Sequence, residues 1–214
     1  MPIIFISLSD TFTEKVKSRG FQAYTMRIEN YKPVRKTYYV SPANSLCFMD
    51  GGIDKALSQL VFPGIETEVK SIVNNIGIRT LLNRPYLPIG SSIIIEKGQK
   101  NLIVAPTMLL PQNVSNTLNA YYATMAVLYN VLINHRENIN NVNIIFTSFC
   151  CGYGKMSEEE SINQILRGFQ DFQNYNPKII NSNIIINQPN LLEQPKYYQN
   201  TEWFNINPKD IIKC

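Results

Sequence analysis

The sequence predicts an α/β protein with a mostly parallel central sheet that is covered by helices on both faces. Segments with strand character alternate with segments whose apolar residues recur at helical spacing, which is the pattern of such folds. The predicted strands are short, continuous apolar runs, as is typical of parallel strands that are buried on both faces. With 214 residues, 44% of them hydrophobic, the chain is long enough to bury on the order of 70% of its unfolded surface.

The first predicted elements come before Gly51 and Gly52, the glycine pair of the chain. Residues 3–8 form an apolar run and are predicted as a buried strand. Ser9 or Asp10 follows as a helix cap, so a helix is expected to continue to about Ser18. Segments rich in β-forming residues then predict two strands on either side of a Lys-Pro turn, at residues 24–29 and 36–41.

The middle of the chain alternates in the same way. After the glycine pair, apolar residues recur at helical spacing and predict helices over residues 53–60 and 64–76. A Lys-Gly turn then separates two short apolar runs, which predict strands at residues 93–95 and 102–105.

The next part contains the longest helical pattern of the chain, at residues 114–134. A buried strand is predicted at residues 142–147, and a glycine-containing loop follows at residues 150–154. The last helix with a clear pattern covers residues 157–172.

Beyond residue 174 the composition changes and becomes rich in Asn, Ile, Pro and Tyr. We therefore predict two parts, a domain at residues 1–174 and a C-terminal extension at residues 175–214. Within the extension, residues 179–186 are expected to add an edge strand, and residues 188–214 to wrap the domain or to stay mobile.

The charge pattern argues against a nucleic-acid partner. Twenty basic and sixteen acidic residues give a net charge of +4, and the cations are spread along the chain instead of forming a stripe. The start of the chain lacks the pattern of a signal peptide, and no apolar stretch approaches the ~20 residues that cross a bilayer. The four cysteines include no CxxC pair. We expect a cytoplasmic protein without membrane contact, metal or cofactor.

Two loops are candidate ligand sites, because ligands of parallel sheets bind where strands run into helix N-termini. This rule selects residues 41–54, the first loop, and residues 147–156, the second loop. The first loop reads Ser-Pro-Ala-Asn-Ser and ends in Met-Asp-Gly-Gly-Ile-Asp. Its glycines let the backbone approach a ligand, and the helix start favours negative charge. A tight strand-to-helix turn without a ligand explains the same residues equally well.

The first loop also resembles the signature loop of macro domains, which bind ADP-ribose. Within this family, the loop is most similar to that of a branch found in bacteria and phages, whose members share two further motifs. This chain contains both in the same order, Ala-Pro-Thr-Met at residues 105–108 and Gly-Tyr-Gly-Lys-Met at residues 152–156. The resemblance covers residues 3–172 and implies a three-layer α/β/α sandwich.

The resemblance also implies roles for single residues. The family's first loop carries an Asn that contacts the distal ribose, which is Asn44 here. In hydrolytic members, an Asp in the next helix supports attack on the anomeric carbon, and Asp54 matches it. These two are the candidate catalytic residues, and stabilisation of the helix dipole is the alternative role of Asp54. The candidate ligand-binding residues are Asn30, Ala43, Gly51, Gly52, Ile53, Cys151, Gly152, Tyr153 and Gly154.

The sequence departs from the family pattern in both halves of the expected site. The position of the adenine-binding Asp is taken by Asn30, with Glu29 beside it. In the second loop, Cys150 and Cys151 stand where Gly and Thr are typical. A Cβ atom at Cys150 is expected to narrow the phosphate site or to change its backbone angles.

Three hypotheses for the function remain. The first is a macro domain that binds ADP-ribose or a derivative and hydrolyses ADP-ribosyl esters, or phosphorylated or acetylated ADP-ribose, without a metal. The second is a reader of ADP-ribosylated proteins or of a related nucleotide without turnover. The third is a structural component, such as one of a phage or viral particle, that keeps the fold and has lost the pocket. The partners under the first two are ADP-ribose or an ADP-ribosylated protein.

Overall fold

Six strands form one sheet in the order β2-β1-β6-β3-β5-β4. The computed structural model describes residues 2–134 and 139–174, so the predicted extension lies outside the described residues. All neighbouring strands are parallel except β4, which pairs antiparallel with β5 at one edge. The mostly parallel sheet that the sequence predicts is therefore confirmed. The strands are β1 (Ile3–Ser7), β2 (Gln22–Thr25), β3 (Thr37–Ser41), β4 (Ile93–Ile95), β5 (Lys100–Val104) and β6 (Asn143–Phe146).

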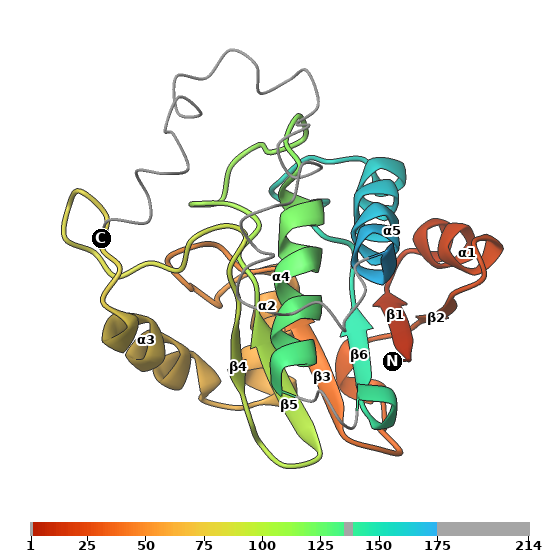
Figure 1. Cartoon of the computed structure of the whole chain (residues 1–214), viewed down its shortest axis with the longest axis horizontal. Coiled ribbons are helices and arrows are strands. Elements are labelled where there is room, and N and C mark those ends of the chain that lie inside the picture. Colours follow the sequence, from red (N-terminus) through yellow and green to blue (C-terminus); the bar gives the residue numbers. More distant parts are fainter. Residues whose placement is uncertain (1, 135–138, 175–214) are drawn as a thin grey trace. The chain divides into compact units, whose positions relative to one another are not determined.

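The helices form a layer on each face of the sheet (Figure 1). One apolar core lies between the sheet and α1, α4 and α5, and a second lies between the sheet and the α2–α3 region. The predicted three-layer α/β/α sandwich is thus confirmed. The α-helices are α1 (Asp10–Ser18), α2 (Gly52–Ala56), α3 (Ile65–Ile76), α4 (Asn119–Asn134) and α5 (Glu158–Asn174). Shorter helical segments are the 3₁₀-helices η1 (Ile28–Asn30) and η3 (Ile139–Asn141) and the π-helix η2 (Leu57–Val61).

The strands are continuous apolar runs because successive side chains enter the two cores alternately. In β3, Tyr38 and Val40 pack into the core with α4 and α5, whereas Tyr39 packs into the core with α3. All three side chains are fully buried. None of the described helices is long and apolar enough to span a bilayer.

The predicted strand at residues 24–29 is wrong in its second half. β2 ends at Thr25, and the chain turns through η1. The cause is the register, because β2 pairs only with β1 and Thr25 is aligned with Ser7, the last residue of that strand. Beyond this point β2 has no neighbouring strand to pair with, so the backbone forms hydrogen bonds within the turn of η1. Ile28 of this turn is buried in the core with α3.

Two predicted helices also differ from the structure. The helix expected from residue 114 begins at Asn119, because residues 114–117 form a separate turn in which the N–H and the hydroxyl of Thr117 both donate to the carbonyl of Val114, at 3.2 and 2.7 Å. The helix expected at residues 53–60 is divided into α2 and the wider π-helical turn η2.

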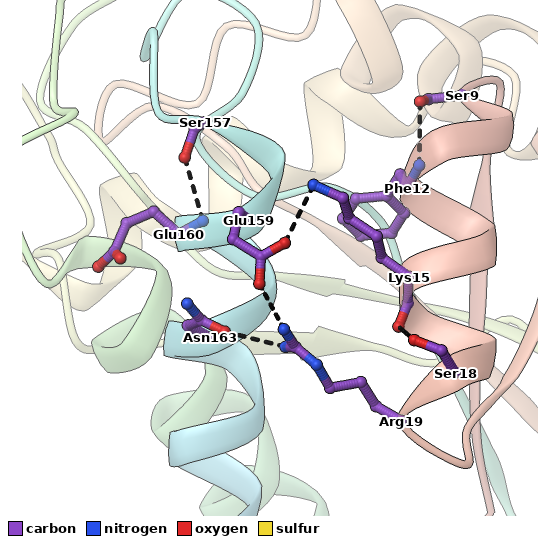
Figure 2. Close-up of polar contacts among 9 residues, drawn as sticks. All are labelled: Ser9, Phe12, Lys15, Ser18, Arg19, Ser157, Glu159, Glu160 and Asn163. Atoms are coloured by element: carbon purple, nitrogen blue, oxygen red, sulfur yellow. Dashed lines mark hydrogen bonds and ion pairs between the residues drawn. The ribbon is translucent and has the colours of Figure 1, made fainter.

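Polar contacts fix α1 against α5 (Figure 2). Ser9 and Ser157 cap the two helices, each accepting a backbone hydrogen bond at 3.1 Å. The carboxylate of Glu159 forms ion pairs with Lys15, at 3.0 Å, and with Arg19. These contacts therefore join the two helices that follow the neighbouring strands β1 and β6.

Candidate functional site

A cleft of about 600 Å³ opens at the carboxyl ends of β1, β3 and β6. Residues of both candidate loops line it, together with the end of β1 and residues 26–29. The two loops that sequence reasoning selected therefore face the same space. The candidate residues that line the cleft are Asn44, Gly51, Gly52, Ile53, Asp54, Cys151, Gly152 and Tyr153.

Three candidate residues do not line the cleft. Asn30 is exposed at the end of η1, and its neighbour Glu29 faces the cleft instead. Ala43, within the first loop, is fully buried. Gly154 is buried inside the second loop, where a Cβ atom would lie only 2.3 Å from the carbonyl oxygen of Cys150. Gly154 therefore permits the loop to fold tightly on itself.

Tyr153 of the second loop lies close to the glycine pair of the first loop. A Cβ atom at Gly51 would lie 3.6 Å from the ring of Tyr153. The ring is 69% exposed, so it borders the opening of the cleft and does not fill it. Gly52, the next residue, has a φ of +52°, a left-handed conformation that glycine adopts without strain. The glycine pair thus turns β3's loop into α2 and brings it against the second loop.

Asn44 organises the first loop. Its side-chain amide donates to the carbonyl of Phe48 at 2.9 Å, and its side-chain oxygen accepts from the backbone N–H of Phe48 at 3.3 Å. An Asn side chain has two donor hydrogens and two acceptor lone pairs, so one of each remains for a ligand. Asn44 can therefore hold the loop and contact a ligand at the same time.

Asp54 lies in the first turn of α2 with its carboxyl group enclosed by the protein. The hydroxyl of Ser41, at the end of β3, donates to this carboxylate at 2.6 Å. Burial raises the pKa of Asp54 to about 7, against the opposing effect of the Ser41 hydrogen bond, and the nearby charge of Asp50 adds to the rise. A carboxyl group with such a pKa can accept or release a proton near neutral pH.

The second loop contains a non-glycine residue in a glycine conformation. Cys150 has a φ of +63°, which costs a residue with a Cβ atom about 1 kcal/mol or more. Cys150 therefore keeps a left-handed backbone conformation although it carries a Cβ atom. Burial raises the pKa of the Cys150 thiol to about 12 and also raises the pKa of Cys151. Neither thiol is therefore activated as a nucleophile near neutral pH.

The backbone of the second loop offers hydrogen-bond donors to the cleft. The N–H groups of Gly152 and Tyr153, two residues that line the cleft, have no hydrogen-bond partner among the described residues. The carbonyls of Cys150 and Gly152 instead accept from Met156 and Lys155, which closes the loop at 3.1 and 3.2 Å. Successive free N–H groups at a bend of the chain form a concave site for an anion.

Sequence reasoning missed several residues of the cleft. Glu29 lines it and forms an ion pair with Arg27, at 3.3 Å. Thr147, in the second loop, also lines the cleft, and its hydroxyl is buried with no hydrogen-bond partner among the residues that the structure describes. The position of Glu29 beside the expected adenine-binding residue was a usable signal, whereas an unpaired hydroxyl has no signal in the sequence.

Within residues 2–134 and 139–174, no group of three or more His, Cys, Asp or Glu side chains is arranged to hold a metal ion.

Solved structures of macrodomains share this fold. A variant of the Oceanobacillus iheyensis macrodomain with ADPR is 17% identical over 81% of this chain and 79% of that chain, with a TM-score of 0.55. The Oceanobacillus iheyensis macrodomain with ADP is 20% identical over 71% of this chain and 75% of that chain, with a TM-score of 0.54. The macrodomain of Mycobacterium tuberculosis DarG is 15% identical over 80% of this chain and 93% of that chain, with a TM-score of 0.51.

These likenesses establish that the chain has the macro domain fold. No protein-family model matches the sequence, and no curated protein matches it significantly. At these identities the fold is shared while the site has to be judged from its own residues.

Proposed function

We propose that the cleft binds ADP-ribose or an ADP-ribose derivative. The observation that carries this proposal is that both candidate loops line one cleft of about 600 Å³. This volume lies within the range of small-molecule sites. A macrodomain with the same fold has been solved with ADPR, which supports this choice of ligand.

The residues of the cleft fit the parts of such a ligand. The free N–H groups of Gly152 and Tyr153 suit the diphosphate, because backbone N–H groups can donate to anionic oxygens without a cationic side chain. The distal ribose would lie beside Asn44 and Asp54, which present an amide and a carboxyl group. The base would lie toward Ile28 and Glu29, where an apolar surface borders a carboxylate that can accept a hydrogen bond from an amino group.

Gly152 provides a test of the binding proposal that leaves the fold intact. It lines the cleft, and a Cβ atom there would meet no atom within 4 Å. Gly152→Val should therefore place a side chain in the cleft without a clash inside the protein. Ser71→Val, on the exposed side of α3, adds a similar side chain outside the cleft.

Isothermal titration with ADP-ribose should give binding heat for the wild-type protein and for Ser71→Val. Gly152→Val should bind at least tenfold more weakly with an unchanged melting temperature. Absence of both heat and a melting shift for the wild-type protein at millimolar ADP-ribose would end the binding proposal and favour a structural component.

Asp54 favours hydrolysis of an ADP-ribosyl ester as a second candidate function. In this reaction a water oxygen bonds to C1 of the distal ribose, the bond from C1 to the ester oxygen breaks, and the carboxylate released takes the bond electrons. Asp54 would accept the proton of the attacking water, a role that its pKa of about 7 permits near neutral pH. Asn44 would hold the sugar in position.

Release of ADP-ribose from an ester-modified test protein distinguishes an enzyme from a reader. Asp54→Asn keeps the size of the side chain and can still accept a hydrogen bond from Ser41. It should lower the release rate by at least a hundredfold while ADP-ribose still binds. A wild-type protein that binds ADP-ribose and leaves the modification intact would instead be a reader.

A further inference from the structure

Thr147 is the residue of the cleft whose polar group the fold leaves unsatisfied. Its side chain is 4% exposed, and its hydroxyl has no hydrogen-bond partner among the described residues. An unpaired buried hydroxyl is unfavourable, and most buried polar groups in proteins are paired. Neither role assigned above, to Asn44 or to Asp54, uses this hydroxyl.

The register of the sheet places Thr147 at the floor of the cleft. Phe146 of β6 is aligned with Phe5 of β1, and Ile145 is aligned with Tyr39 of β3. One step further along these strands, Thr147 lies between Ile6 and Ser41. Side chains alternate between the faces of the sheet, so Thr147 shares its face with Ile145, which packs into the core with α3. It therefore lies on the side of the sheet that carries Asp54.

The surroundings of Thr147 fit the nucleoside half of a ligand. Ile6 and Ile28 belong to one apolar cluster, and both line the cleft. Together they present an apolar surface on which a base can lie, and Thr147 borders it on the β6 side. The hydroxyl of Ser41, on the other side, already donates to Asp54. Thr147 thus adds an uncommitted donor and acceptor beside the apolar surface.

The hydroxyl of Thr147, a residue that lines the cleft, can change its direction by rotation about the Cα–Cβ bond. Such a rotation exchanges the positions of the hydroxyl and methyl groups between staggered rotamers. It breaks no hydrogen bond with a described residue, because the hydroxyl has no such partner. A ligand that offers a hydrogen bond therefore favours the rotated side chain.

We propose that Thr147 is a specificity-determining residue whose hydroxyl forms a hydrogen bond with the nucleoside half of the ligand. This inference rests on the proposed binding of ADP-ribose. It differs from that proposal because it assigns a role to one side chain and to one half of the ligand.

Thr147→Val tests the inference, since valine has the shape of threonine and lacks the hydroxyl. Isothermal titration with ADP-ribose and with AMP, which has the nucleoside but no distal ribose, should show both affinities lowered roughly three- to tenfold. The same variant without ligand should melt about 2–4 °C higher, because an unsatisfied hydroxyl has been removed. Thr147→Ser, which keeps the hydroxyl, should bind both ligands nearly as the wild-type protein does.

The outcomes separate this inference from the proposed function. If the wild-type protein binds ADP-ribose and Thr147→Val binds both ligands equally well, the hydroxyl makes no ligand contact and the inference is wrong. It is also wrong if the variant weakens ADP-ribose and leaves AMP unchanged, since the contact would then lie outside the nucleoside. If the wild-type protein binds neither ligand, the proposed function fails first, and the inference falls with it.

Discussion

The buried carboxyl group of Asp54 predicts a specific dependence of stability on pH. A pKa raised from 3.8 to about 7 means that the folded protein holds this proton more tightly than the unfolded chain does. Below about pH 4 the group is protonated in both states and has no effect. Between about pH 4 and pH 7 only the unfolded state loses the proton, so the free energy of unfolding falls as the pH rises.

The size of this effect follows from the same values. At 1.36 kcal/mol for each pH unit, the rise of the pKa from 3.8 to about 7 corresponds to at most about 4 kcal/mol. Above pH 7 the loss is complete, because Asp54 is then ionised in both states. Asp54→Asn removes the titrating group and keeps an acceptor for the Ser41 hydroxyl, so it should lack this loss.

Urea unfolding at half-unit steps from pH 4.5 to pH 8 measures the effect. The variant should gain stability relative to the wild-type protein as the pH rises, with most of the gain below pH 7. Asp50→Asn is the control, because Asp50 is exposed and its charge is a smaller contribution to the pKa of Asp54. Parallel pH curves for the wild-type protein and Asp54→Asn would refute the reasoning.

Three further predictions concern the loops and the α1–α5 contact. Gly154→Ala should lower the free energy of unfolding by about 1–3 kcal/mol in urea titrations, because the Cβ atom of the alanine would lie 2.3 Å from the Cys150 carbonyl oxygen. An unchanged free energy of unfolding would contradict this tight packing. Cys47 and Cys150 should resist iodoacetamide at pH 8 in the folded protein and react in urea, since burial raises both pKa values to about 12. Peptide mass spectrometry measures the labelling, and rapid labelling of either thiol in the folded protein would count against this burial. Glu159→Gln should lower the melting temperature slightly at low salt and not at 1 M NaCl, because the ion pairs of Glu159 with Lys15 and Arg19 are exposed and are screened by salt. A lower melting temperature that persists at 1 M NaCl would contradict this explanation.

The layered fold could be predicted because its strands are buried on both faces. β3 shows this directly, since Tyr38, Tyr39 and Val40 enter opposite cores and all are apolar in the sequence. The errors occur where a distant segment decides the local structure. β2, for example, ends at Thr25 because its neighbour β1 ends at Ser7. No local pattern contains this information.

The residues of the candidate site also fall into those that a local sequence pattern identifies and those that depend on distant segments. The glycine pair and the Asn-Ser turn of the first loop are local features, and they led to residues that line the cleft. The neighbours Glu29 and Asn30 are harder to separate, because only the turn of η1 decides which of them faces the cleft. Thr147 could not be found, since its unpaired hydroxyl results from the packing of neighbouring strands.

The proximity of Asp54 to the cleft would couple the binding of an anionic ligand to the uptake of protons. An anion that enters the cleft disfavours a second negative charge nearby, so it shifts this carboxyl group further toward its neutral form. Each molecule of a phosphorylated ligand would then be bound together with a fraction of a proton taken from solution near pH 7. The heat of association would therefore depend on the ionisation enthalpy of the buffer, and the affinity would increase on mild acidification.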